Sequence, residues 1–233
     1  MRVEIWSDVV CPWCAIGKRR FESALGRFEH RDEVEVVWRS FELDPAAPGS
    51  IDVSSTRRLA DKYGVSLAQA RAMEQRVTDA GAAEGLDFRY DLARPGNTLD
   101  AHRVLHLAAD RGVQPAVKER LLLAYFAEGE PIADRRTLAR LAADAGLDAD
   151  ETARMLDSEE YTAAVRADEA EARALGIQGV PFFVLDRRYG VSGAQPADVL
   201  LQVLRRAWTE AHPLTVVAGA GAGQTCTDDS CAV

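Results

Sequence analysis

Hydrophobic and polar positions divide the chain into three stretches, and the first predicts an α/β unit. A short apolar run at residues 3–6 is typical of a strand, and a second strand is expected at residues 34–38. Between them, a helix over residues 15–28 has an apolar stripe formed by Phe21, Ala24, Leu25 and Phe28. A strand–helix–strand unit implies a parallel strand pair with a right-handed crossover.

The second stretch, residues 44–159, is helical in pattern. Prolines and small residues at 45–50 break the chain first. Helices are then expected near residues 55–84, 98–111, 114–127, 137–145 and 149–156. A segment of this length does not occur as a loop inside a compact domain. We therefore expect an inserted, all-helical subdomain.

The third stretch, residues 160–212, returns to an α/β pattern. It predicts a helix from Tyr161 to Leu175, a strand at 182–185 with a hairpin partner at 189–191, and a closing helix near 199–208. Residues 1–43 and 160–212 together give the strand and helix order of a thioredoxin fold, an α/β fold interrupted by the helical subdomain. Residues 213–233, rich in Gly and Ala, predict a flexible C-terminal tail.

Composition and charge narrow the function classes. The 233 residues carry a formal net charge of -9, which argues against nucleic acid or an anionic membrane surface as a partner. No apolar run approaches the roughly 20 residues of a membrane span, and no signal-peptide pattern precedes the first strand. We therefore expect a cytoplasmic protein. Its four cysteines are too few for a disulfide scaffold, so catalytic, redox-sensing or metal-binding roles are favoured.

The sequence Cys11-Pro12-Trp13-Cys14 lies where the first strand gives way to the first helix. Unpaired N–H groups and the helix dipole at such a position stabilise a thiolate, and a second cysteine one turn on can close on the first. Pro12 fits the opening of a helix because its missing N–H is not needed there. This pattern predicts Cys11 as the attacking thiolate and Cys14 as the resolving thiol. An isolated CxxC can also be half of a zinc site or a chance pairing.

A second candidate element is Val180-Pro181, immediately before the strand at 182–185. A proline there indicates a strand start, a bulge or a cis turn. If Pro181 follows a trans bond, it simply begins the strand. If the bond is cis, the backbone of Val180 lies beside the two sulfurs and can pair with an extended substrate segment.

The chain resembles the DsbA-like thioredoxin superfamily and, within it, the FrnE-like group of cytoplasmic oxidoreductases. Four segments carry this resemblance, at residues 7–17 (SDVVCPWCAIG), 41–45 (FELDP), 97–103 (NTLDAHR) and 176–184 (GIQGVPFFV). It implies a thioredoxin fold with a helical insertion, a redox-active CxxC and a cis-proline loop facing it. The 2-hydroxychromene-2-carboxylate isomerases and kappa-class glutathione transferases resemble the chain in layout but have serine at the position of Cys11.

The segment around Asn97 and His102 has two interpretations. Asn97 or Thr98 can cap a helix that carries a solvated His102, or the segment can line the active-site cleft, with Asn97 facing it as the resemblance to the isomerases implies. His102 and His106 are four residues apart, a chelating spacing, but no third ligand lies within a turn. We therefore predict no metal site.

Cys226 and Cys231 form a further pair in the tail. They can be without a role, they can exchange with Cys11 and Cys14 as a second redox pair, or all four cysteines can bind one zinc. The resemblance supports the second redox pair, since some FrnE-like proteins carry such a CxxxxC.

These features predict a thiol–disulfide oxidoreductase or disulfide isomerase that acts on protein disulfides, dithiols or small thiols. We expect no cofactor, with glutathione as a candidate redox partner. One alternative is a glutathione-dependent isomerase or transferase with the same fold. Another is a redox-gated or zinc-holding interaction module without catalytic activity.

Overall fold

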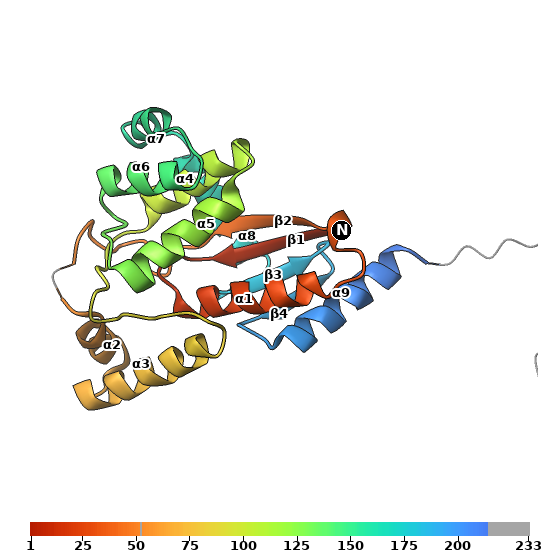
Figure 1. Cartoon of the computed structure of the whole chain (residues 1–233), viewed down its shortest axis with the longest axis horizontal. Coiled ribbons are helices and arrows are strands. Elements are labelled where there is room, and N and C mark those ends of the chain that lie inside the picture. Colours follow the sequence, from red (N-terminus) through yellow and green to blue (C-terminus); the bar gives the residue numbers. More distant parts are fainter. Residues whose placement is uncertain (52, 214–233) are drawn as a thin grey trace, which may run out of the picture.

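A four-stranded sheet forms the centre of the α/β part. The structure is a computed structural model, and it describes residues 1–51 and 53–213. The strands are β1 (Arg2–Ser7), β2 (Glu35–Ser40), β3 (Phe182–Leu185) and β4 (Tyr189–Ser192). Their order is β2-β1-β3-β4, with β1 parallel to β2 and the other neighbours antiparallel (Figure 1). The parallel pair and the β3–β4 hairpin confirm the sequence prediction.

Strand β1 is the central strand of this sheet. Its Ile5 is paired with Trp38 of β2 on one side and with Phe183 of β3 on the other. Five of its six residues are buried, on both faces of the sheet. Apolar side chains above and below β1 therefore have to be covered by helices.

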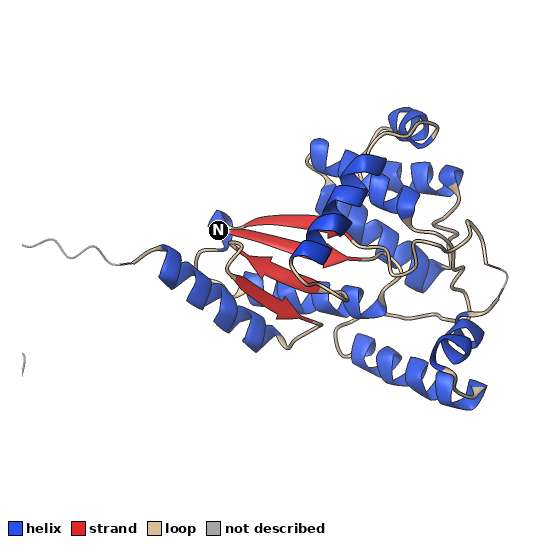
Figure 2. Cartoon of the chain, turned by 180° about the vertical axis from the view of Figure 1, so that it is seen from behind, coloured by secondary structure: helices blue, strands red, loops and turns tan. Residues whose placement is uncertain are grey.

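Helices cover both faces of the sheet. Helices α1 (Pro12–Gly26) and α9 (Ala197–Ala211) lie on one face, where Phe21, Phe183 and Leu204 belong to one buried cluster (Figure 1). Helix α8 (Thr162–Ala174) lies on the other face and crosses the strands in the view from behind (Figure 2). There the indole N–H of Trp6 donates a hydrogen bond of 2.9 Å to the Asp168 carbonyl of α8.

The remaining elements, apart from the short 3-10 helix η1 (Arg31–Glu33), form the helical stretch between β2 and α8. They are α2 (Ser55–Tyr63), α3 (Leu67–Ala82), α4 (Leu99–Asp110), α5 (Gln114–Leu123), the π-helix η2 (Ala124–Glu128), α6 (Arg135–Asp144) and α7 (Ala149–Leu156). Their core joins α1 through Ala15 and Ile16. These findings support the thioredoxin fold with helices inserted, whereas the proposed domain limits stay a prediction. No helix among the described residues is long and apolar enough to cross a membrane.

The prediction of one continuous helix at residues 55–84 is wrong, because the structure has two helices there. Gly64 ends α2 in the left-handed conformation, at a φ of 63° that suits glycine. Ser66 then begins α3 with a capping box, in which its side chain and that of Gln69 each satisfy the other's backbone N–H. The helix predicted at 114–127 likewise changes to a π-helix after Leu123.

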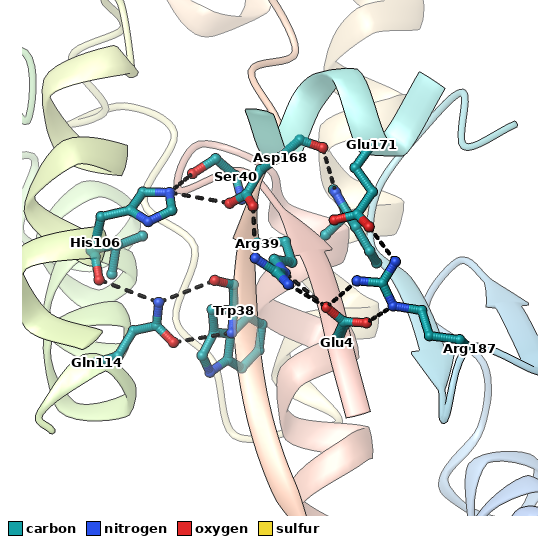
Figure 3. A network of polar contacts seen from close by, with 11 residues as sticks. Glu4, Trp38, Arg39, Ser40, His106, Gln114, Asp168, Glu171 and Arg187 are labelled. Carbon is teal, nitrogen blue, oxygen red and sulfur yellow. Dashed lines mark hydrogen bonds and ion pairs between the residues drawn. The ribbon is translucent and has the colours of Figure 1, made fainter. Parts of the chain in front are cut away.

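An ion-pair network crosses the sheet through Glu4, a buried carboxylate in the middle of β1 (Figure 3). Arg39 of β2 and Arg187 of the β3–β4 turn donate hydrogen bonds of 2.9 and 2.8 Å to it. Arg39 also pairs with Asp168 of α8 at 3.0 Å, and Asp168 pairs with His106 of α4 at 3.1 Å. The network therefore connects β1, β2, the β3–β4 turn, α8 and the helical stretch.

Replacing Glu4 with Gln is expected to destabilise the fold by about 2 kcal/mol at neutral pH, because two arginines lose their shared counter-charge. Burial alone would raise the pKa of Glu4, but hydrogen bonds from Arg187 and Arg39 lower it below the ordinary value. Its ionised form therefore stabilises the fold above the ordinary carboxyl pKa, and this contribution is lost as the pH falls through the lowered pKa. Urea unfolding of wild type and Glu4→Gln between neutral and acidic pH measures the difference, which should shrink in acid.

The matched control is Glu35→Gln on the neighbouring strand. Glu35 is exposed, and its nearest guanidinium nitrogen, on Arg2, is 4.0 Å away. Glu35→Gln should change the unfolding free energy by no more than about 0.5 kcal/mol. An equal loss in both variants, or a Glu4→Gln loss that does not change with pH, would contradict the role of the network.

Candidate active site

The two cysteines lie where β1 leads into α1. Cys11 is the N-cap of α1, Pro12 is in its first turn, and the Cys14 N–H donates to the Cys11 carbonyl at 3.0 Å. This is the junction that the sequence predicts. Cys11 is 4% exposed and Cys14 1%, and both are free thiols. The pair therefore lies in a largely water-free environment.

A second loop meets the first cysteine from a distant part of the sequence. The Val180–Pro181 peptide bond, between α8 and β3, is cis. The Cys11 Sγ atom lies 3.6 Å from the Val180 carbonyl oxygen, to which the thiol donates. The ring of Pro181 packs against Gly17 of α1, where a Cβ atom would lie only 2.8 Å from the Pro181 Cγ atom. The absence of a side chain at position 17 thus lets this loop approach α1.

A cavity of about 840 Å³ opens above Cys11. Its floor includes Pro12, the 42% exposed Trp13, Gly179 and Val180. Its roof comes from α2, α3 and neighbouring segments, and includes Arg58, Leu59, Lys62, Tyr63, Met73, Val77, Tyr90 and Tyr125. Of the two described thiols, Cys11 lines this cavity and Cys14 lies behind it.

Near the thiols, the carboxylate of Asp8 is contacted by a side chain of α4 and by a backbone N–H that follows β2. His102 Nε2 of α4 lies 3.3 Å from Asp8 Oδ1, and the backbone N–H of Leu43 donates to Oδ2 at 2.8 Å. Burial would raise the pKa of Asp8, but His102, the Leu43 N–H and the charge of Lys118 lower it below the ordinary value. Asp8 is therefore an ionised carboxylate in a buried position. His102 is itself fully buried, so the interpretation of a solvated helix residue is wrong.

The two thiols differ in how easily they ionise. The neighbouring Cys14 side chain and burial raise the pKa of Cys11 well above its ordinary value. For Cys14, burial opposes ionisation, but the neighbouring Cys11 side chain and the charge of Lys118 lower the pKa. The pKa values of the two thiols are therefore shifted in opposite directions, and Cys14 is the easier of the two to ionise. The role of Cys11 as the attacking thiolate stays a prediction.

Lys118 of α5 is a site residue that the sequence analysis missed. Its side chain is 1% exposed, and its ammonium lies 5.5 Å from the centroid of the Trp38 ring. Burial lowers the pKa of Lys118 to about 8, against the opposing influence of Cys14, Asp8 and Cys11. No local motif marks Lys118, because its neighbours come from separate segments of the chain.

Comparison with known proteins identifies the family. A family model described as the DSBA-like thioredoxin domain matches residues 2–205. The chain belongs to this family. A probable DsbA oxidoreductase from Streptomyces coelicolor is 49% identical over all of this chain and 99% of its own, with a TM-score of 0.87. The finer assignment of this DsbA-like chain to the FrnE-like group stays a prediction.

Two further relatives are more distant. The uncharacterized protein YwbO of Bacillus subtilis is 27% identical, over 85% of this chain and 93% of its own. The cytosolic disulfide reductase DsbM of Pseudomonas aeruginosa, solved with GSH, is 21% identical over 89% of this chain and 99% of its own, with a TM-score of 0.62. DsbM thus shares the fold of this DsbA-like chain.

Other candidate residues of the DsbA-like chain lie apart from the thiols. The Asn97 side-chain amide donates to the carbonyls of Ala47 (3.2 Å) and Pro45 (3.4 Å), and its oxygen accepts from the Leu99 N–H at the start of α4. Asn97 therefore fixes a loop and a helix start, while its neighbours Gly96 and Thr98 line the cavity. Cys226 and Cys231 lie outside the described residues. Within residues 1–51 and 53–213, no three or more His, Cys, Asp or Glu residues form a group able to hold a metal.

Replacing Gly17 with Ala is expected to destabilise the protein by about 1–3 kcal/mol, because the new methyl group would overlap the Pro181 ring. Displacement of the loop should also change the rate at which Cys11 reacts with iodoacetamide. Gly26→Ala, on the same helix but with no atom within 4 Å of the new Cβ, is the control. Urea unfolding and alkylation rates measure both effects, and equal behaviour of the two variants would contradict the proposed packing.

Proposed function

We propose that this DsbA-like chain is a thiol–disulfide oxidoreductase in which Cys11 attacks the substrate and Cys14 resolves the mixed disulfide. The observation that carries the proposal is the unequal access of the two sulfurs. Cys11 faces a cavity large enough for a substrate, and Cys14 lies behind it, within hydrogen-bond contact of the Cys11 thiol. An incoming disulfide therefore meets Cys11 first.

The arrangement supports each step of exchange. A thiolate must be the nucleophile, so the Cys11 thiol gives its proton to water in the cavity before it attacks. The negative charge that develops on the Cys11 sulfur lies at the N-terminus of α1, where unpaired N–H groups stabilise an anion. Cys14, one turn along α1, then attacks Cys11 and expels the substrate thiolate. The same steps in reverse transfer a disulfide to a substrate dithiol.

The cavity also suggests the size of the substrate. A volume of about 840 Å³ falls in the range of small-molecule sites, roughly 300–1,000 Å³. The cavity is lined by charges of both signs, and the backbone of Val180 can pair with an extended peptide. Its basic residues are Arg58 and Lys62, and its acidic residues are Asp8, Asp44, Asp61 and Glu74. Small thiols such as glutathione, named as GSH with DsbM, and extended protein segments are therefore the proposed partners. A cytoplasmic location, in keeping with the cytosolic DsbM, is part of this proposal.

A glutathione-dependent isomerase or transferase is the second candidate, and the size of the cavity at Cys11 is the observation that favours it. Such an enzyme would activate glutathione at position 11 and hold a small substrate below α2 and α3. It would have no need of a second thiol behind the first. The presence of Cys14 in contact with Cys11 favours the dithiol mechanism.

Replacing Cys14 with Ser should abolish turnover and trap Cys11 in a mixed disulfide with glutathione, because no thiol remains to resolve it. Mass spectrometry after incubation with glutathione disulfide should show one glutathione per chain, and Cys11→Ser should show none at this site. Reduction of a small disulfide, followed by loss of NADPH in a coupled assay, measures turnover.

The matched control is the double variant Cys226→Ser and Cys231→Ser, which keeps the CxxC. If this variant keeps full turnover, the tail pair has no part in the cycle. If turnover falls while trapping at Cys11 persists, the tail pair takes part in the cycle. Turnover that survives Cys14→Ser would overturn the dithiol mechanism and favour the glutathione-dependent isomerase or transferase.

A further inference from the structure

Glu74 is a buried acidic residue of the cavity wall that exchange between Cys11 and Cys14 does not by itself require. It lies in α3, which packs beside α2 and apart from α4 to α7 (Figure 1). The Thr56 hydroxyl of α2 donates a hydrogen bond of 2.7 Å to Glu74 Oε2. The other oxygen, Oε1, is buried and has no hydrogen-bond partner among the described residues. One half of this carboxylate is therefore unsatisfied, in a residue that is only 9% exposed.

The other acidic residues of the cavity each have a basic partner. These pairs are Asp44 with Arg58 at 3.7 Å, Asp61 with Arg57 at 3.0 Å, and Asp8 with His102 at 3.3 Å. In the part of the chain that the structure describes, Glu74 has only the Thr56 hydroxyl. A buried carboxylate that lacks a cation is unfavourable, so a ligand that brings a positive charge to Glu74 is stabilised there.

Glu74 shares its cavity with the first cysteine. Both residues line the same space of about 840 Å³, which is the size of a site for one small molecule. A disulfide that presents its sulfurs to Cys11 therefore extends along the wall that contains Glu74. Burial and the charge of Glu74 raise the pKa of Tyr90, another residue of this wall. The negative charge of Glu74 thus acts inside the cavity.

We propose that Glu74 is a specificity-determining residue that binds the ammonium group of a substrate disulfide. This inference rests on the proposed function and narrows its substrates to disulfides of amine-bearing thiols. An ammonium has three N–H donors and a positive charge, so it can satisfy the unpaired oxygen of Glu74. Rotation about the last side-chain bond of a glutamate has a broad energy profile, so either oxygen can turn toward the cavity.

The charges around the cavity agree with a cationic substrate. Of the described residues that line it, four are acidic and two are basic, and the basic Arg58 is already paired. The other basic residue, Lys62, is exposed, so salt screens its attraction for an anion. The formal net charge of -9 on the chain attracts cations over longer distances. A metal ion fits the site less well, because no three His, Cys, Asp or Glu side chains among the described residues form a group able to hold one.

Three small disulfides with the same two-carbon arms separate the effect of charge from the exchange reaction. Cystamine carries ammonium groups, bis(2-hydroxyethyl) disulfide is neutral, and dithiodipropionate carries carboxylates. The parent chain has Cys226 and Cys231 replaced by Ser, so that only Cys11 and Cys14 react. Its reduced form is mixed with each disulfide at neutral pH, quenched in acid and alkylated, and mass spectrometry follows formation of the Cys11–Cys14 disulfide. Dividing each rate constant by that of dithiothreitol with the same disulfide removes differences in intrinsic reactivity.

Glu74→Gln should lower the rate constant for cystamine about 30-fold relative to that for the neutral disulfide, because a hydrogen bond between two charged groups is lost. The rate constant for the neutral disulfide should stay close to that of the parent chain, which also shows that the variant folds. Glu74→Asp keeps the charge and should retain part of the preference for cystamine. An unchanged preference in Glu74→Gln would overturn the proposal.

Asp61→Asn is the matched control, because it removes the same charge from the same cavity at an exposed residue that Arg57 already neutralises. This control should change the preference for cystamine much less than Glu74→Gln does. Equal losses in the two variants would show that only the total charge of the cavity matters, and would overturn the role of Glu74.

The parent chain tests the proposal without any substitution at Glu74. Its corrected rate constants should decrease in the order cystamine, neutral disulfide, dithiodipropionate. Equal constants for the three disulfides, or a preference for the dicarboxylate, would overturn the ammonium site and leave thiol–disulfide exchange at Cys11 intact. Absence of exchange with all three disulfides would instead overturn the proposed function.

Discussion

The burial of β1 on both faces and both edges is the constraint on which the rest of the structure depends. A strand paired with β2 on one side and β3 on the other has no freedom to slip, because a shift of one residue would exchange its two buried faces. Its C-terminal end at Ser7 is therefore fixed, and so is the start of α1 five residues later. The same burial explains Glu4, since a carboxylate inside such a strand needs arginines from its neighbours.

The helices between β2 and α8 complete the site electrostatically as well as sterically. Helix α4 supplies His102 and helix α5 supplies Lys118, and both act on groups of the β1–α1 junction. The cavity roof comes from α2 and α3. An isolated β1–α1 junction would expose its thiols to water, where a nearby cation has little influence on a thiolate. The insertion thus changes the chemistry of the CxxC without adding a residue between the cysteines.

Local features of the site could be predicted from the sequence, and long-range ones could not. The CxxC, its position at a strand–helix junction and the proline before β3 follow from neighbouring residues and from hydrophobic periodicity. The break between α2 and α3 was also readable, in Gly64 and in the Ser66–Gln69 spacing, and was missed because the apolar pattern continues across it. Lys118 and the burial of His102 depend on how helices pack across many tens of residues, and no local pattern encodes that packing.

The two cysteines differ through their surroundings, although they lie on one turn of one helix. Cys11 faces the cavity and the Val180 carbonyl, while Cys14 does not line the cavity and has its pKa lowered by the charge of Lys118. Because the two pKa shifts run in opposite directions, ionisation of the enclosed Cys14 is favoured over ionisation of Cys11. A thiolate at Cys11 can meet an incoming disulfide, whereas a thiolate at Cys14 is on the enclosed side. The buried cation that favours ionisation of Cys14 therefore acts on the second sulfur, which attacks only after the mixed disulfide has formed.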